Sequence, residues 1–138
     1  MSADLPSVDL AAGSAFVAST KFAVTEATGT RVSGTVDLGP DQHTPWGVVH
    51  GGVYCSVVES AASIGASTAV QERGQFAVGV NNNTDFLRSM TAGRLDVVAE
   101  PIQQGRTQQL WQVLLTRDDG KLVARGQVRL QNVPLPGS

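Results

Sequence analysis

The sequence has few charges and a single cysteine, and each shortage excludes a class of protein. Charged residues make up 16% of the 138 residues and the net charge is −2, which indicates neither a disordered chain nor a nucleic-acid-binding surface. The lone Cys55 excludes an internal disulfide and a cysteine-rich metal site. His43 and His50 are the only histidines and have no nearby carboxylate pattern, so we expect no metal and no other cofactor.

Long apolar segments are missing as well. No run approaches the roughly 20 residues of a membrane span. The start of the chain, MSADLPSVDLAAGS, has neither the basic residues nor the continuous apolar core of a signal peptide. We therefore expect a cytoplasmic protein that binds neither a membrane nor a nucleic acid.

The most informative stretch is residues 43–67, HTPWGVVHGGVYCSVVESAASIGAS, which is typical of a turn followed by a helix. No proline interrupts residues 53–71, which predicts a helix of about 19 residues and roughly 28 Å. Gly51 and Gly52 stand at its start and allow a close backbone approach. The unpaired N–H groups and the positive end of the helix dipole, with His50 beside them, favour developing negative charge.

Glu59 is the only charged residue of this helix. Ionised carboxylates are rarely buried without partners, so a glutamate among Val and Ala residues requires an explanation. It points away from the helical stripe that we assign to the face packed on a sheet, and Ser56 and Ser63 share its face. That stripe consists of Val53, Val57, Ala61, Ile64 and Thr68. A solvated glutamate on the outer helix face is the alternative interpretation.

Alternating apolar residues predict two strands before the helix and four after it. Thr28-Gly29 is the expected turn of the first hairpin, and Asp118-Asp119-Gly120 that of the last. Gly74 is expected to end the helix. The expected strands are residues 15–27, 30–38, 75–86, 94–101, 108–117 and 122–131.

The sequence accordingly predicts an α+β fold, in which a six-stranded antiparallel sheet wraps one long central helix. One helix leaves a face of such a sheet poorly covered, so association of two chains through an edge or a face is expected. We divide the chain into an N-terminal arm (residues 1–14), a single domain (residues 15–132) and a frayed tail (residues 133–138). A short helix is expected within the arm at residues 7–12.

Three motifs make the chain resemble the hotdog-fold acyl-CoA thioesterases over residues 15–131. They are Gly47-Val48-Val49-His50-Gly51-Gly52 with Glu59, Phe86-Leu87-Arg88 with Gly93, and Gly105-Arg106-Thr107 leading to Trp111. The resemblance is closest to the branch of phenylacetate-pathway and glutamate-using 4-hydroxybenzoyl-CoA thioesterases. It implies a hotdog fold and a homodimer with active sites between subunits, often paired into a tetramer.

The resemblance also implies catalytic roles. Glu59 matches the carboxylate that acts as nucleophile or as general base toward water. Gly51 matches the residue whose backbone N–H polarises the thioester carbonyl, and His50 orients the substrate or assists at that carbonyl. Ser63 matches the hydroxyl that holds the water or the departing acid.

One position departs from close relatives, which have a glutamine where this chain has Thr44. Gln42 or His43 is a candidate replacement. Trp46 and Trp111 are assigned to the core or an interface rather than to substrate stacking. The residues expected to bind the substrate or coenzyme A are Thr44, Gly52, Ser60, Phe86, Arg88 and Arg106.

The helix geometry also favours a site between two chains. Gly51 and Glu59 are about 12 Å apart along one helix, too far for one to hold a thioester carbon and the other to attack it. Two antiparallel helices meeting across a dyad would bring each Glu59 toward the other chain's Gly51.

We therefore expect an acyl-CoA thioesterase that hydrolyses an aromatic or medium-chain acyl-CoA thioester to the free acid and coenzyme A. Two alternatives stay open: a non-catalytic acyl-CoA-binding hotdog protein, and a hotdog hydratase or dehydratase. The second would need a catalytic histidine paired with Asp or Asn on the helix. The sequence leaves open the acyl group, covalent against general-base chemistry, and dimer against tetramer.

Overall fold

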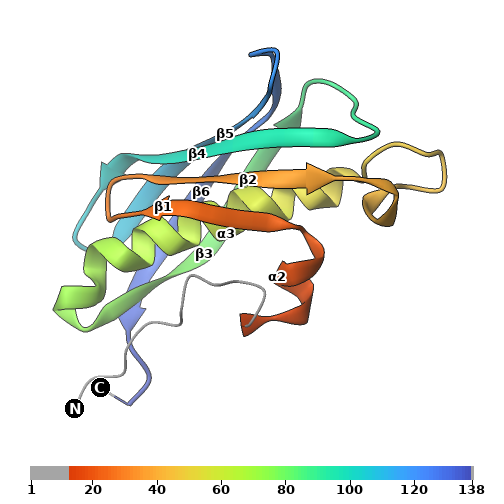
Figure 1. Ribbon diagram of the computed structural model, residues 1–138. Helices are drawn as coiled ribbons and strands as arrows, with labels where there is room; N and C mark the ends of the chain where they lie inside the picture. The colour runs from red at the N-terminus through yellow and green to blue at the C-terminus, as the bar shows by residue number, and fades with distance from the viewer. Residues whose placement is uncertain (1–12, 138) are drawn as a thin grey trace.

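The computed structural model describes residues 13–137, so the helix expected at residues 7–12 and nearly all of the N-terminal arm lie outside it. Six strands and one long helix make up the described domain (Figure 1). The strands are β1 (Phe22–Ala27), β2 (Val32–Leu38), β3 (Gln75–Phe86), β4 (Gly93–Gln104), β5 (Gln108–Arg117) and β6 (Leu122–Pro134), and the long helix is α3 (Gly51–Val70).

The strands form one antiparallel sheet in the order β1-β2-β4-β5-β6-β3, which curves around α3 (Figure 1). Consecutive hairpins connect β4, β5 and β6. β2 pairs with β4 across the segment that contains α3 and β3, and β3 pairs with β6 across β4 and β5. β1 and β3 are therefore the two edge strands. This is the hotdog fold expected from the sequence.

The two ends of α3 are set by His50 and Gly74, both of which were expected near the helix ends from the sequence. His50 is the N-cap, and its Nδ1 accepts a hydrogen bond from the Gly52 N–H at 2.8 Å. A short 3-10 turn, η2 (Gln71–Arg73), follows the helix. Gly74, with φ of +70°, then reverses the chain, as predicted for a glycine at a helix end.

The buried face of α3 is rotated from the predicted stripe. Val57 and Ala61 are buried as predicted, but Val53, Ile64 and Thr68 are only half-buried. The buried residues are Tyr54, Val57, Val58, Ala61, Ala62, Gly65, Ala66, Ser67 and Val70. A face built largely of Ala and Gly gives little hydrophobic periodicity, and a curved sheet covers more than one stripe.

Gly65 lies where α3 approaches the sheet most tightly. A Cβ at Gly65 would be 2.4 Å from Cη2 of Trp111, whose side chain is 0% exposed. The Trp111 Nε1 donates to Gln109 Oε1 at 2.9 Å, and Gln109 Nε2 donates to the Ala66 carbonyl oxygen at 2.9 Å. The assignment of Trp111 to the core is confirmed, whereas Trp46 is 86% exposed and lies outside the core.

The first predicted strand begins too early. Residues 15–19 form a helix, α2 (Ala15–Ser19), and β1 begins only at Phe22. Ser14 caps α2 by accepting a hydrogen bond from the Val17 N–H at 3.3 Å. Lys21, with φ of +64°, then turns the chain into β1. A capping serine before alanine favours a helical turn, which the apolar alternation obscured.

The last strand runs past its predicted end at residue 131 to Pro134. Its final residues pair with the first residues of β3. Leu135 is buried, and its N–H donates to the Gly74 carbonyl oxygen at 2.9 Å. The frayed tail expected from residue 133 is therefore wrong for residues 133–135, because pairing with β3 and the bond to Gly74 hold their backbone in place.

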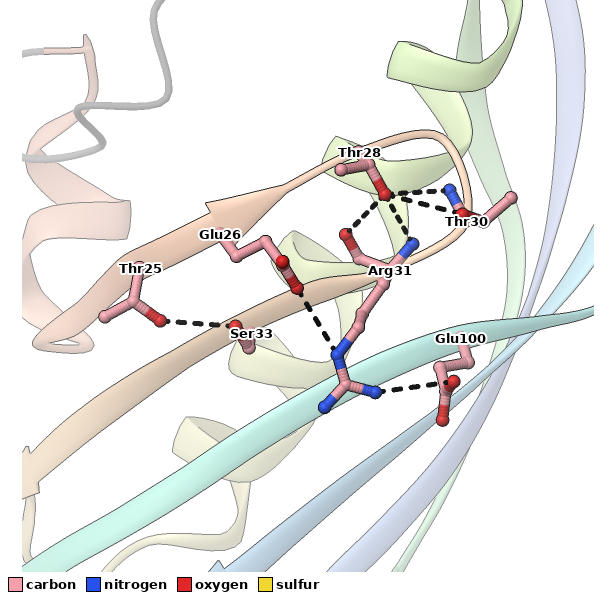
Figure 2. A network of polar contacts seen from close by, with 7 residues as sticks. All are labelled: Thr25, Glu26, Thr28, Thr30, Arg31, Ser33 and Glu100. Atoms are coloured by element: carbon pink, nitrogen blue, oxygen red, sulfur yellow. Dashed lines mark hydrogen bonds and ion pairs between the residues drawn. The ribbon is translucent and has the colours of Figure 1, made fainter.

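The β1–β2 hairpin is fixed at its turn by Thr28 and on its outer face by Arg31 (Figure 2). The Thr28 Oγ1 accepts hydrogen bonds from the N–H groups of Thr30 and Arg31 at 3.2 and 3.0 Å. The Arg31 guanidinium contacts Glu26 at 3.3 Å and Glu100 of β4 at 3.4 Å. These charged side chains are about half exposed, so the ion pairs add little stability and the turn depends mainly on Thr28.

The segment Gly51–Arg73 is the one helix of the described residues that is long and apolar enough to cross a membrane. Half of its most apolar window is buried inside the protein. A helix wrapped by its own sheet has this composition because it forms the core. We therefore assign this segment as a core helix.

Candidate active site

The start of α3 offers one free backbone N–H beside His50. The Gly52 N–H donates its hydrogen bond to Nδ1 of the His50 ring and is therefore not available to a ligand. The Gly51 N–H has no hydrogen-bond partner among the described residues. It lies at the positive end of a 20-residue helix, where an anion or a developing oxyanion is stabilised.

Phe86, at the end of β3, covers one side of this helix start. A Cβ at Gly51 would lie 2.3 Å from the Phe86 ring, so glycine is needed to keep the ring in place. The ring also packs on Tyr54, with centroids 5.7 Å apart. A cavity of about 260 Å³ lies here, lined by Gly51, Tyr54, Phe86, Arg88 and their neighbours.

Tyr54, which lines this cavity, has a buried hydroxyl. Its hydroxyl is the one buried side-chain polar atom of residues 13–137 without a hydrogen-bond partner. Burial raises the pKa of the Tyr54 hydroxyl, because the phenolate would lose its hydration. The side chain is therefore protonated at neutral pH.

Glu59 lies against the edge strand β3. Its Oε1 accepts a hydrogen bond from Asn82 Nδ2 at 3.1 Å, and a Cβ at Gly79 would be 2.0 Å from its Oε2. The side chain is half-buried, and no cation of the described residues forms an ion pair with it. Glu59 is therefore packed against β3 rather than fully exposed to solvent.

The sequence of this region assigns the chain to a family. Residues 47–124, which contain α3, β3, β4 and β5, match the Thioesterase superfamily. The chain belongs to the Thioesterase superfamily.

Relatives within the superfamily agree in sequence and fold. A candidate esterase of Mycobacterium tuberculosis is 51% identical over 100 residues, which are 71% of each chain. Its solved structure has a TM-score of 0.83 at 45% identity and covers 86% of this chain and 96% of its own. A thioesterase structure from Haemophilus influenzae has a TM-score of 0.84 at 25% identity and covers 98% of this chain and 96% of its own.

A third relative carries a more specific name. The 1,4-dihydroxy-2-naphthoyl-CoA hydrolase of Listeria monocytogenes is 37% identical over 81 residues, which are 59% of this chain and 65% of that protein. The resemblance, the fold and the thioester hydrolase class expected from the sequence are confirmed.

Three serines of the thioesterase helix lie within one turn of Glu59. The Ser56 hydroxyl donates to the Gly52 carbonyl oxygen at 2.8 Å, so it is engaged within the helix. Ser60 and Ser63 are half-buried, and neither hydroxyl has a hydrogen-bond partner among the described residues. Ser63 therefore keeps a free hydroxyl for the role that the resemblance implied.

Neither candidate for the missing glutamine is free in this superfamily member. Gln42 is buried, and its Nε2 donates to the Thr20 carbonyl oxygen at 2.9 Å. The His43 Nε2 lies 2.6 Å from the Thr91 carbonyl oxygen. Thr44 bonds within its own turn. The suggestion that Gln42 acts at the thioester carbonyl is wrong, because both ends of its amide are bonded to backbone groups, of Gly39 and Thr20.

Arg88 and Arg106 lie near opposite ends of α3. Arg88 lines the cavity beside Gly51, and its Nη1 donates to the Leu122 carbonyl oxygen at 2.6 Å. The Arg106 carbonyl oxygen accepts a hydrogen bond from Arg73, just beyond the helix C-terminus, at 2.8 Å. The length of α3 separates these points by roughly 30 Å. One chain therefore does not bring the two arginines together.

A second cavity, of about 280 Å³, lies between α2 and the start of α3. Phe16 and Ser19 of α2 form one wall, and His50 and Val53 belong to the other. Apolar alternation favours a strand at residues 15–19, so this wall could not be predicted from the sequence.

Four further residues near the site were not predicted from the sequence: Gly79, Asn82, Thr84 and Tyr54. Local signals existed for the first two, because asparagine is uncommon in strands and an interior strand glycine often marks a close approach. Residues 81–83 are all asparagine. Thr84 and Tyr54 carried no such signal, since threonine is common in strands and a helical tyrosine is typical of a core.

Proposed function

We propose that this protein hydrolyses an aromatic or medium-chain acyl-CoA thioester to the free acid and coenzyme A. The main support is Glu59, a carboxylate without a cation partner in the described part of the chain. It is held on the helix whose first free N–H belongs to Gly51. The name of the Listeria relative supports an aromatic acyl group.

In the proposed reaction, the Gly51 N–H donates to the thioester carbonyl oxygen as it becomes an oxyanion, and His50 orients the substrate. Glu59 either takes a proton from water while the water oxygen attacks the carbonyl carbon, or attacks that carbon to give an anhydride that water then opens. In both routes the C–S bond breaks and coenzyme A leaves as a thiolate. Ser63 is proposed to hold the water or the departing acid.

The proposal includes a homodimer with sites between its chains. Gly51 and Glu59 are about 12 Å apart along one helix, so one chain does not supply both groups to one carbonyl. The edge strand β3 carries exposed Val78, Val80 and Phe86, which supports pairing along this edge with a second chain. We expect this dimer, or a pair of such dimers, in the cytoplasm.

Coenzyme A is proposed to enter along the cavity at the start of α3. Phe86 and Arg88 line this cavity with Gly51, so they are candidates to contact the thioester end of the substrate. Arg106 lies near the far end of α3 in its own chain. It is therefore a candidate to bind the nucleotide phosphates of a coenzyme A molecule whose thioester lies in the site of a neighbouring chain.

Release of free thiol from a panel of acyl-CoA thioesters tests this function. The panel contains benzoyl-, phenylacetyl-, 1,4-dihydroxy-2-naphthoyl-, octanoyl- and crotonyl-CoA. We expect turnover of an aromatic or medium-chain member, and a fall in kcat of at least about 10²-fold in Glu59→Gln with a smaller change in KM. Near-normal turnover in Glu59→Gln would reject the role of Glu59. Binding without turnover would indicate an acyl-CoA-binding protein, and hydration of crotonyl-CoA a hydratase.

A further inference from the structure

Three residues of β3, Gly79, Asn82 and Thr84, determine the surroundings of the Glu59 carboxylate, and we call them the frame. Asn82 bonds the carboxylate, Thr84 bonds Asn82, and Gly79 leaves room for the carboxylate. We propose that Asn82, Thr84 and Gly79 are positioning residues that hold this carboxylate in one orientation before substrate binds. The inference rests on the proposed catalytic role of Glu59. It adds residues that the superfamily motifs in this sequence do not include.

The Asn82 amide joins β3 to α3 at the turn that carries Glu59. Its Nδ2 donates to the Cys55 carbonyl oxygen at 3.1 Å and to Glu59 Oε1 at 3.1 Å. The two amide hydrogens therefore reach two acceptors that lie one helical turn apart. Rotation of the carboxylate away from β3 would break the second of these bonds.

Thr84 determines which end of the Asn82 amide faces the helix. Its Oγ1 donates to Asn82 Oδ1 at 2.7 Å. A flipped amide would lose this bond and would place its oxygen against the Cys55 carbonyl and the Glu59 carboxylate, which are also acceptors. The Thr84 hydroxyl thus keeps Nδ2 directed at Glu59.

A β-bulge and a glycine let the strand approach the carboxylate. Residues three apart on a regular strand face opposite sides of the sheet, yet Gly79 and Asn82 both contact Glu59. The register of β3 on β6 shifts between Gly79 and Asn81, which places both residues on the helix side. A Cβ at Gly79 would lie 2.0 Å from Glu59 Oε2, so any larger residue displaces the carboxylate.

The two oxygens of the Glu59 carboxylate have different hydrogen-bond partners. Oε1 accepts the Asn82 hydrogen bond, whereas Oε2 has no donor among the described residues. Oε1 is therefore held in place, and the lone pairs of Oε2 stay available to accept a proton from water or to attack the carbonyl carbon. Displacing a reacting group by about 1 Å can cost roughly 10²-fold in rate, so loss of the frame should lower kcat.

Hydrogen-bond variants of β3 test the proposal. In Asn82→Ala and Thr84→Val we expect kcat on the best panel substrate to fall about 10-fold, with KM changed less than about twofold. Thr84→Ser keeps the donor and should recover most of the lost kcat. Gln103→Ala is the control, because Gln103 is an exposed amide on β4, away from the β3 edge, without a side-chain bond to another described residue.

Gly79→Ala tests the steric part of the frame. Its Cβ should displace the carboxylate and lower kcat by about 10²-fold. Gly39→Ala is the control, since nothing lies within 4 Å of a Cβ at Gly39. Thermal unfolding of each variant reports whether the fold is retained, and the Thr84→Val and Thr84→Ser pair decides the outcome if Gly79→Ala does not fold.

The outcomes separate this inference from the proposed function. If Glu59→Gln is inactive while Asn82→Ala and Thr84→Val keep kcat within about twofold of wild type, the positioning role is wrong and the thioesterase mechanism stands. If Glu59→Gln stays active, the proposed function itself fails. A loss in Thr84→Val that Thr84→Ser does not recover, or an equal loss in Gln103→Ala, overturns the hydrogen-bond argument.

Discussion

Gly65 is the residue that sets how closely α3 packs on the sheet. A methyl group there would lie 2.4 Å from the fully buried Trp111 ring, which has no open side to move into. We predict that Gly65→Ala destabilises the protein by about 1–3 kcal/mol, the usual cost of overpacking a core. Urea unfolding followed by circular dichroism measures the difference.

Gly39→Ala is the control for this measurement, because a Cβ at Gly39 meets no atom within 4 Å and the backbone there is extended. It should change the free energy of unfolding by less than about 0.5 kcal/mol. Equal stability of Gly65→Ala and wild type would mean that α3 can move outward without loss of packing.

The sequence identified Glu59 because a single charge among Val and Ala residues is unusual in any helix. It did not identify Asn82 as the partner. Their hydrogen bond joins residues 23 positions apart and depends on the bulge between Gly79 and Asn81. A glycine inside a strand signals a close approach there, but no local pattern names the residue that is approached. Chemically unusual residues are thus predictable, and their long-range partners are not.

The N-terminus of α3 depends on a histidine that acts as a cap. The His50 Nδ1 accepts the Gly52 N–H, so His50→Ala leaves that donor unpaired. We predict a loss of about 1 kcal/mol in the free energy of unfolding, and a smaller loss in His50→Asn, whose side-chain oxygen can accept the same bond. Thermal unfolding of the two variants measures this difference.

The kcat of the same two variants shows whether His50 only caps the helix or also takes part in the reaction. If His50 also orients the substrate, His50→Asn should regain stability without regaining kcat. Recovery of both quantities in His50→Asn would mean that the side chain serves only the helix.

The helices and strands that are bounded by glycine or proline were predicted best. The expected bounds of β3 and β5 agree with the structure, and α3 lies within two residues of its expected start, because glycine and proline mark these limits. The short helix at residues 15–19 was missed, since five residues give too little periodicity to tell a helix from a strand. The strand order was also hidden, because pairing of β3 with β6 has no local signal.

At the scale of the whole molecule, subunit mixing tests whether the site crosses between chains. Glu59→Gln and Gly51→Pro should each be inactive, since proline removes the N–H of residue 51. In a mixed dimer one of two sites would keep an intact pair. After full subunit exchange we predict about a quarter of wild-type activity, because half of the dimers are mixed.

Gly51→Ala is the matched control for this experiment. Both alanine and proline push the Phe86 ring away, since any Cβ at Gly51 would lie 2.3 Å from it, but alanine keeps the N–H. Gly51→Ala should therefore retain more activity than Gly51→Pro. Mixed dimers that are present by mass spectrometry but inactive would place both groups in one subunit.

The unequal burial of the two tryptophans makes this protein its own optical reporter. Trp111 is 0% exposed and Trp46 is 86% exposed, so their fluorescence should divide into a shielded, blue-shifted component and one that iodide quenches. Trp46 stands four residues before His50, and unfolding of the core changes mainly the surroundings of Trp111. A single emission spectrum can therefore follow events at the mouth of the helix separately from the integrity of the fold, with no added label.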